Sequence, residues 1–337
     1  MFGIAIRIQQ ALARKPPPET TPRGRLLGRI QATYVVDGDY GFSSFAEMQL
    51  LYRDRSNGLV PCTKIVQDGV TLLRINSLGC KGPEIDPSLP AVAFFGDSAT
   101  MGAAGDTTNG DADSWPEHVD LPGYAILNAA AEGANLETIV PRYEQIRARV
   151  PLVCAVVYAG WHNIVYNKRD EKYWESRLTR FLSDDHLTAF CNLATCLTPE
   201  FATRGVGPLL DERPGSTVND TYFNFWGDLD PATWIPRLEE HIPRYNAFLA
   251  DFCSRHERPL IDLHSLLAPT RYEDAPVDFF DICHPRPRAY PKIGAFVTEE
   301  LGPHLLRAPV TVAATHGPEV AVEPEGEDLR KNLYPLW

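Results

Sequence analysis

Residues 91–98 read Ala-Val-Ala-Phe-Phe-Gly-Asp-Ser, and this stretch decides the fold class. Its first five residues form an unbroken apolar run, which is typical of a parallel strand that is buried on both faces. The Gly-Asp-Ser that follows ends the run and predicts a sharp turn into a helix. Residues 152–158 form a second apolar run of the same kind. The two runs therefore predict the core of a parallel sheet.

The segments around these runs alternate between helix and strand patterns. Apolar residues recur at helical spacing between residues 136 and 146, where Pro141 is expected to bend the helix or delay its start. A long helix is predicted over residues 235–255, and a strand follows at 259–263. Strands joined by helices of this length give a doubly wound α/β sheet.

Segments of different composition flank this α/β region, which covers residues 89–308. Residues 1–28 are a basic arm that ends in a Pro-rich linker, and residues 29–88 contain short β-like runs separated by turns. We expect residues 29–88 to form a small β-rich extension. Residues 309–337 are an acidic tail.

Residues 167–234 do not follow the alternation of strand and helix patterns and are interpreted as an insertion. The segment at residues 174–197 has a helical pattern, and the second half of the insertion is rich in Pro, Gly and aromatic residues. An addition of this size near the carboxyl edge of a sheet is interpreted either as a lid over a site or as a structural decoration.

The overall composition argues against several kinds of partner. The chain has 32 Lys and Arg against 44 Asp and Glu, so its formal net charge is −12, and an acidic surface repels the phosphates of nucleic acid. The histidines and the seven dispersed cysteines show no metal-ligand spacing, and the sequence contains no Gly-rich phosphate loop. We therefore expect no nucleic acid, no metal and no cofactor.

The cysteines and the first residues bear on location. Dispersed cysteines without CxxC pairs favour reduced thiols, and no signal-peptide core or spanning stretch is seen, so a cytoplasmic protein is expected. Ile4, Ile8 and Leu12 share one helical face beside basic residues. That face fits either a helix docked on the core or a helix on a membrane surface, and the docked helix is favoured.

Ser98 stands where an open α/β sheet collects its reacting groups, beyond the carboxyl end of a strand. A hydroxyl at this turn would project into the crevice, with its own backbone N–H facing the same space. The tripeptide alone is weak evidence, because Asp97 could simply cap the following helix. Asp97 is also a candidate for contacting substrate.

Two further motifs follow strands of the predicted sheet. Gly133 lies after the strand at residues 124–127, and a glycine there offers a backbone N–H that no side chain obstructs. Asn163 ends the motif Gly-Trp-His-Asn after the strand at residues 152–158, and its amide could donate to a developing oxyanion. Taken alone, the Gly133 motif is better interpreted as a plain turn from strand to helix, and Asn163 could simply cap the next helix. Trp161 and His162 are candidates for contacting substrate.

The sequence Asp281-Ile-Cys-His284 supplies a base and a group to orient it. With this spacing Asp281 can hold one imidazole nitrogen while the other nitrogen faces Ser98, which is how a hydroxyl becomes a nucleophile. Asp278 lies six residues before His284 and is the less favoured orienting group.

Taken in order, these four motifs resemble those of the SGNH or GDSL hydrolases, over roughly residues 91–301. Residues 74–84 also resemble the lead-in of bacterial members that carry an N-terminal β extension. The resemblance implies a flavodoxin-like three-layer α/β/α sandwich. It implies these roles: Ser98 as nucleophile, His284 as base, Asp281 as its orienting partner, and an oxyanion hole made by the N–H groups of Ser98 and Gly133 and the amide of Asn163.

The third motif departs from the family pattern, which usually reads Gly-x-Asn-Asp. Here His162 adds a residue between Gly160 and Asn163, and Ile164 stands in place of the Asp. The departure makes Asn163 a weaker candidate than Ser98 or His284.

The favoured function is hydrolysis of a small acyl ester, with an O-acetyl carbohydrate or other small-molecule or glycan ester as substrate by analogy with the family. An acyltransferase that uses the same triad and an acceptor other than water is an alternative. An inactive binding module on the same fold is another, and so is an enzyme that works at a lipid surface.

Overall fold

A computed structural model gives the structure of the chain, and it describes residues 34–36, 59–67, 70–102, 114–164, 170–201, 231–279 and 282–306. The basic arm at residues 1–28, the acidic tail at residues 309–337 and the Pro- and Gly-rich part of the insertion at residues 202–230 lie outside the described residues. Asp281 lies outside them as well.

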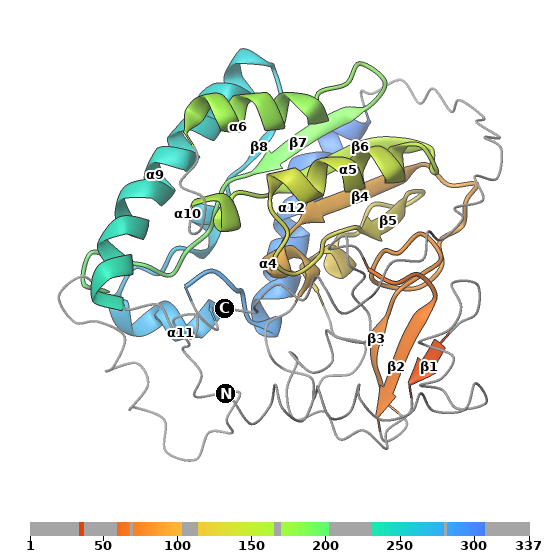
Figure 1. Cartoon of the computed structure of the whole chain (residues 1–337), viewed down its shortest axis with the longest axis horizontal. Coiled ribbons are helices and arrows are strands. Elements are labelled where there is room, and N and C mark those ends of the chain that lie inside the picture. The colour runs from red at the N-terminus through yellow and green to blue at the C-terminus, as the bar shows by residue number, and fades with distance from the viewer. Residues whose placement is uncertain are drawn as a thin grey trace, which may run out of the picture.

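A five-stranded parallel sheet forms the centre of the molecule (Figure 1). Its strands are β4 (Ala91–Gly96), β5 (Ala125–Asn128), β6 (Leu152–Tyr158), β7 (Leu187–Cys191) and β8 (Leu260–Ile261). They lie in the order β5-β4-β6-β7-β8, which is the 2-1-3-4-5 order of flavodoxin-like folds. Every residue of β4 is buried, as its unbroken apolar run predicts. The predicted doubly wound sheet is therefore confirmed.

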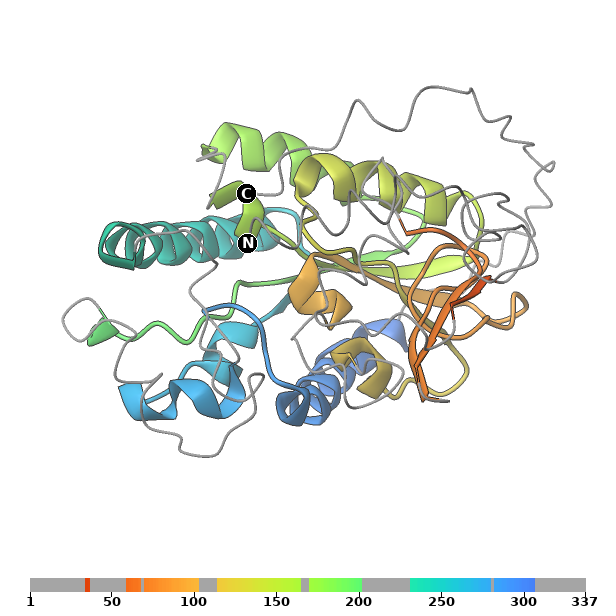
Figure 2. The same cartoon turned by 60° about the horizontal axis from the view of Figure 1, so that its bottom comes forward.

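Helices cover both faces of this sheet, with α5 and α6 over one face and α12 over the other (Figure 2). The helices are α4 (Ser98–Met101), α5 (Leu136–Arg147), α6 (Glu171–Leu178), α9 (Pro231–Arg255), α10 (Leu263–Leu267), α11 (Ala275–Asp278) and α12 (Tyr290–Leu305). The 3-10 turns are η2 (Trp115–His118), η4 (Thr179–Phe181), η5 (Tyr272–Asp274) and η6 (Pro287–Ala289). Among the described helices, none combines the length and apolar character needed to cross a membrane.

Helix α5 shows how local sequence sets a boundary. Asn135 accepts a hydrogen bond from the backbone N–H of Thr138, and the Thr138 side chain bonds back to the N–H of Asn135, which completes a capping box. Because the cap fixes the start at Leu136, Pro141 lies inside the helix and does not delay its start. The buried face of α5 places Tyr143 edge-to-face on Phe95 of β4.

The prediction of a helix over residues 174–197 is wrong beyond Phe181, where η4 ends. Helix α6 ends at Leu178, and β7 follows and pairs in parallel with β6 and β8. Part of the predicted insertion is therefore a strand of the central sheet. The run from Leu187 to Cys191 is too short for its periodicity to separate a buried strand from a helix, so tertiary pairing decides.

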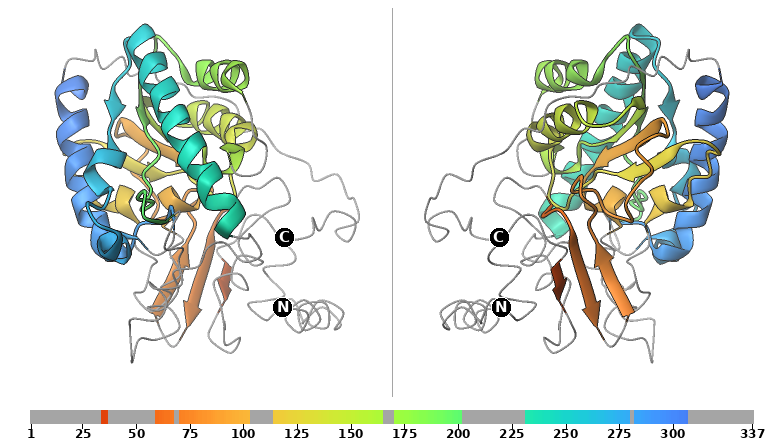
Figure 3. Two further views of the ribbon diagram at one scale, coloured as in Figure 1. Left: turned by 90° about the vertical axis from the view of Figure 1, so that its left-hand side faces the viewer. Right: turned by 90° about the vertical axis from the view of Figure 1, so that its right-hand side faces the viewer.

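The β-rich extension contains three strands that lie to one side of the α/β layers (Figure 3). They are β1 (Tyr34–Val36), β2 (Thr63–Gln67) and β3 (Val70–Arg74). After β3 the chain is bonded to the α/β region, because the N–H of Lys81 donates to Asn128 O at 2.9 Å. The buried Lys81 Nζ donates to Met101 O at 2.8 Å, and Arg142 of α5 donates to Gly79 O at 2.6 Å.

Candidate active site

Ser98 and His284 meet at the carboxyl edge of the central sheet. The Ser98 Oγ and the His284 Nε2 are 2.6 Å apart, although the two residues are 186 positions apart in the chain. Ser98 is the first residue of α4, directly beyond β4, and is only half-buried. The structure therefore brings the predicted nucleophile and base within hydrogen-bond distance at an accessible position.

The turn that presents Ser98 is built from the residues around it. The buried Asp97 is the N-cap of α4, and its Oδ1 accepts a hydrogen bond from the N–H of Ala99 at 3.1 Å. A Cβ on Gly96 would overlap Thr100 Oγ1 and lie 2.6 Å from Tyr158 O, so only glycine fits there. The role of Asp97 in this structure is to hold the turn, and contact between Asp97 and substrate stays a prediction.

The loop that carries His284 is fixed at both ends. The N–H of Arg286 donates to Asp278 O at 2.7 Å, and the hydroxyl of Thr195 donates to Ile282 O at 2.8 Å. The second ring nitrogen of His284, Nδ1, lies 3.4 Å from Cys283 Sγ. These bonds hold the loop beside the sheet edge so that the imidazole reaches Ser98.

The two candidate orienting carboxylates can be compared only in part. The Asp278 carboxylate lies 3.6 Å from Lys292 Nζ in α12, which gives it an ion-pair partner. Asp281 is outside the described residues, so its role as orienting group stays a prediction. The preference for Asp281 over Asp278, which the three-residue spacing indicated, stays a prediction as well.

The segment with Gly133 runs beside the end of β4. The N–H of Ala129 donates to Phe94 O at 2.9 Å, and the N–H of Ala131 donates to Gly96 O at 3.1 Å. Two residues later Gly133 is exposed and has a φ of +67°, a value that favours glycine. The loop thus reaches the same edge of the sheet as Ser98, and its use as an oxyanion donor stays a prediction.

Asn163 has a different environment from the one that the sequence suggested. It is buried, and its Oδ1 accepts a hydrogen bond from the N–H of Leu136 at 2.9 Å. Its Nδ2 donates to Glu137 Oε2 at 3.0 Å and to Tyr173 Oη at 3.3 Å. Both N–H groups of the amide are therefore engaged, and in this arrangement none is left for an oxyanion.

The residues around Asn163 show why the loop takes this path. Gly160 has a φ of +138°, and a Cβ there would lie 2.7 Å from Cζ of the Tyr245 ring in α9. Trp161 is buried, and its Nε1 donates to Tyr158 Oη at 3.2 Å, so its side chain belongs to the core. His162 is only half-buried. Contact between His162 and substrate stays a prediction.

Two buried phenols lie close to the turn of Ser98. Burial, reinforced by the charge of Asp97, raises the pKa of Tyr158 well above its usual value. Burial also raises the pKa of Tyr245, whose Oη donates to Ala159 O at 2.5 Å. Both hydroxyls therefore stay protonated at neutral pH. Tyr245 donates to the loop after β6, and Tyr158 Oη accepts from Trp161 Nε1 and from the N–H of Ala194.

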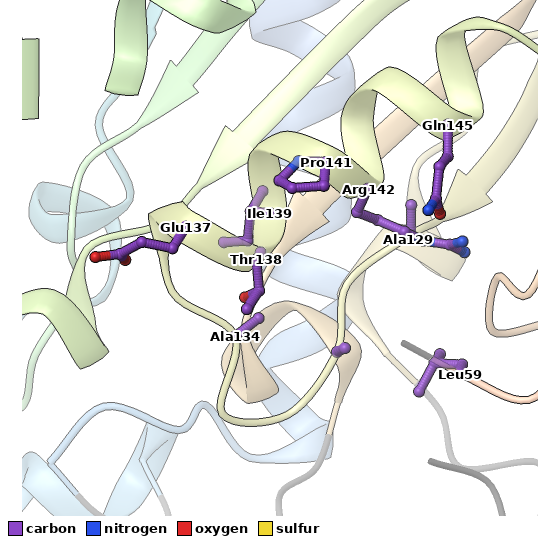
Figure 4. A pocket seen from close by; sticks show the side chains of 11 residues that line it. Leu59, Ala129, Ala134, Glu137, Thr138, Ile139, Pro141, Arg142 and Gln145 are labelled. Atoms are coloured by element: carbon purple, nitrogen blue, oxygen red, sulfur yellow. The ribbon is translucent and has the colours of Figure 1, made fainter. Parts of the chain in front are cut away.

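A small pocket of about 250 Å³ lies along α5 (Figure 4). Figure 4 shows the side chains of Glu137, Arg142 and Gln145 on the helix and Leu59 of the extension across from them. The lining also includes Gly96 and Ala131, which belong to the segments that bound the Ser98 turn. Within the described ranges, no cluster of three or more His, Cys, Asp or Glu residues could hold a metal ion.

No family model matches the chain, and no curated protein matches it. Several solved structures are similar to it. One is a GDSL-like lipase from Bacteroides thetaiotaomicron, at 12% identity and a TM-score of 0.46, with 66% of this chain and 93% of that chain covered. Another is a member of the lipolytic protein G-D-S-L family from Veillonella parvula, at 15% identity and a TM-score of 0.40, with 65% of this chain and 99% of that chain covered. Both neighbours are GDSL proteins.

The GDSL-like motif and the histidine motif were found from the sequence, whereas other residues at this edge of the sheet were not. Lys81, which bonds to the last residue of α4, lies in the lead-in at residues 74–84, but the resemblance implied no role for it. Thr195, which bonds to the histidine loop, lies in a stretch with a helical pattern. The sequence indicates neither contact, because each side chain bonds to a backbone carbonyl that any residue could supply.

Proposed function

We propose that the chain is a serine esterase of the SGNH or GDSL kind, which cleaves a small acyl group from an alcohol. The observation that carries this proposal is the 2.6 Å contact between Ser98 Oγ and His284 Nε2 at the carboxyl edge of a parallel sheet. A hydroxyl in contact with an imidazole is the minimal unit that makes serine a nucleophile. The same contact argues against an inactive binding module.

The reaction follows from this contact in two halves. Ser98 Oγ attacks the ester carbonyl while His284 Nε2 takes the hydroxyl proton, which gives a tetrahedral intermediate with a negatively charged oxygen. The carbon–oxygen bond to the alcohol then breaks, and His284 returns the proton to the leaving alcohol. Water, deprotonated by His284, attacks the acyl-enzyme and releases the acid and Ser98.

The negative oxygen needs donors that already point at it. We assign this role to the backbone N–H groups of Ser98 and Gly133. The amide of Asn163 could join them only by releasing Glu137 or Tyr173. Losing one such donor typically lowers kcat by about 10²–10³. Asp281 is assigned to hold Nδ1 of His284.

The substrate class remains part of the proposal. A short acyl chain such as acetate, carried on a carbohydrate, is the favoured ester, by analogy with the family. An acyltransferase would use the same two residues and differ only in the acceptor. Hydrolysis and transfer are distinguished by incubating the enzyme with an acetate ester and a candidate sugar acceptor. Hydrolysis releases free acetate, whereas transfer gives acetylated sugar, and the amounts of the two products are compared.

The nucleophile is tested with a fluorophosphonate probe and with turnover of p-nitrophenyl acetate. Wild type should be labelled and active, and Ser98→Ala should lose both properties while staying folded. Ser254→Ala, an exposed serine of α9, is the matched control and should behave as wild type. Equal labelling and turnover of Ser98→Ala and Ser254→Ala would rule out Ser98 as the nucleophile.

A further inference from the structure

A second, larger pocket of about 510 Å³ lies away from the small pocket along α5. It is formed by the loop after β7, the first half of α9 and the start of α10, beyond the carboxyl ends of β7 and β8. Ligand sites of open α/β sheets occur outside these strand ends, and sites for small molecules have volumes of about 300–1,000 Å³. The pocket thus has the position and size of a ligand site.

One wall of this pocket is held by a closed set of hydrogen bonds. Asn192 Nδ2 donates to Asp262 Oδ1 at 2.6 Å, and the hydroxyl of Ser265 donates to Asp262 Oδ2 at 2.6 Å. Burial works against the charge of Asp262, but the bonds from Ser265 and Asn192 outweigh it and hold the pKa of the carboxyl below its usual range. The polar groups of this wall therefore satisfy one another.

Three other residues of the lining each have one polar atom that is not satisfied. Thr198 Oγ1, Glu239 Oε1 and His264 Nδ1 are buried atoms without a hydrogen-bond partner in the part of the chain that the structure describes. Thr198 as a whole is more than nine-tenths buried. Native proteins leave few buried polar atoms unpaired, and each one destabilises the fold. Three such residues, on three separate elements around one cavity, indicate a ligand-binding site.

The charges around the pocket restrict what it can bind. Among its described lining residues, Glu239 and Asp262 are acidic and none is Lys or Arg. An anionic ligand is therefore disfavoured. Burial lowers the pKa of His264, against the opposing charge of Asp262, so the imidazole is neutral at pH 7 and offers an acceptor or a donor but no charge.

The remaining lining favours a ligand with several hydroxyl groups over a single ammonium. One ammonium could satisfy the Glu239 carboxylate but would leave the groups on the other two elements unpaired. Hydroxyl groups spread around a ring can reach Thr198, Glu239 and His264 separately. Leu238 and Ile242 of α9 supply an apolar surface for the C–H groups of such a ring.

We propose that this pocket binds a neutral, hydroxyl-rich small molecule of monosaccharide size through Thr198, Glu239 and His264. The site is separate from Ser98 and does not require that the chain cleave esters. It is connected to the histidine loop, because Thr195 of the same lining donates to Ile282 O, two residues before His284. A ligand in this pocket would therefore lie beside Thr195, whose side chain is hydrogen-bonded to the loop that carries His284.

The test measures binding to the full-length chain carrying Ser98→Ala, so that turnover does not interfere and an inactive Ser98 would not affect the result. The probes are methyl glucoside, methyl galactoside and methyl mannoside, followed by ligand-observed NMR and calorimetry at pH 7.5. At least one should bind with a millimolar or lower Kd. Glu239→Gln and Thr198→Val should each weaken that binding by about tenfold.

The matched control is Glu240→Gln, the neighbouring exposed residue of α9, which should leave the Kd unchanged. Glucuronate should bind at least about tenfold more weakly than the neutral sugar, since no lining cation receives its carboxylate. Three outcomes would overturn the proposal: none of the three glycosides binds at 50 mM, Glu239→Gln binds like Glu240→Gln, or glucosamine binds while the neutral sugars do not.

Discussion

At the scale of single residues, the carboxamide of Asn163 is bonded through both its oxygen and its nitrogen. It stabilises the start of α5 through Leu136 and Glu137 and connects it to α6 through Tyr173. A polar side chain buried and bonded in this way has a structural role.

We therefore expect Asn163→Ala to lower the free energy of unfolding by about 2–3 kcal/mol, because the N–H of Leu136 loses its acceptor and the Glu137 carboxylate loses one of its donors. The kcat for p-nitrophenyl acetate, corrected for the folded fraction, should fall less than about tenfold. Urea denaturation and steady-state kinetics on the same preparation measure both quantities. A hundredfold fall in kcat at unchanged stability would instead make the amide an oxyanion donor.

Gly160 offers a second test at this scale, because both its φ of +138° and its contact with Tyr245 exclude a side chain. Gly160→Ala should cost about 2–4 kcal/mol of stability, from backbone strain and overlap together. Gly123→Ala is the control, since Gly123 also has a positive φ, +87°, but open space around its Cβ position. It should cost only about 1–2 kcal/mol. Equal losses in thermal denaturation would mean that the Tyr245 ring gives way.

At the scale of elements, α12 contains two glycines in opposite environments. A Cβ on Gly294 would lie 2.5 Å from the backbone of His118 in η2, whereas a Cβ on Gly302 would meet nothing within 4 Å. The helix therefore packs on η2 through a glycine, and the two positions form a matched pair.

Gly294→Ala should lower the free energy of unfolding by about 1–3 kcal/mol, because helix and turn must move apart. Gly302→Ala should raise it by about 0.5–1 kcal/mol, because alanine is the better helix former. Urea denaturation of the two variants measures whether the free energy of unfolding falls in the first and rises in the second. A gain in stability at both positions would show that α12 does not approach η2 closely.

Several elements could be predicted from the sequence because one local feature determines each of them. The apolar runs of β4 and β6 have no polar face, which only a strand covered on both sides tolerates. Helix α5 follows from its periodicity. Strand β7 could not be predicted, since its short run gains its identity from the neighbours with which it pairs.

The site divides in the same way. Ser98 could be predicted because it directly follows a recognisable strand, and His284 because it stands three residues after Asp281 in a motif that resembles the family's. The bonds of Asn163 could not, because asparagine serves equally well as an amide donor and as a partner for a helix start. The unsatisfied groups of Thr198, Glu239 and His264 come from three distant segments with no shared pattern, so only the folded chain reveals them together.

At the scale of the whole molecule, His186 makes stability depend on pH. Burial, helped by the charge of Arg147, lowers the pKa of His186 to about 4, and its Nε2 lies 3.0 Å from Tyr143 Oη. An unfolded histidine titrates near pH 6.5. At a pH between these two values, His186 is protonated in the unfolded chain and neutral in the folded chain.

Its contribution to stability is therefore fully present above about pH 6.5 and is lost as the pH falls towards 4, by up to about 3 kcal/mol. Urea denaturation at pH 7.5 and 4.5 measures the loss. In His186→Gln, the loss of unfolding free energy between pH 7.5 and 4.5 should be smaller than in wild type by most of that amount. The carboxylates are the same in both proteins, so their contribution to the pH dependence is equal. An identical pH dependence in the two proteins would contradict the assignment.

Lys81 lies in the segment that joins the extension to the sheet, yet its ammonium is bonded at the far end of the short helix that Ser98 begins. A recombinant boundary drawn just before β4, where the family resemblance begins, would remove this cation and leave the carbonyl of Met101 without it. Chimaeras that graft the α/β region onto another scaffold should therefore include the preceding dozen residues. The independently folding unit therefore begins upstream of β4, the first strand of the parallel sheet.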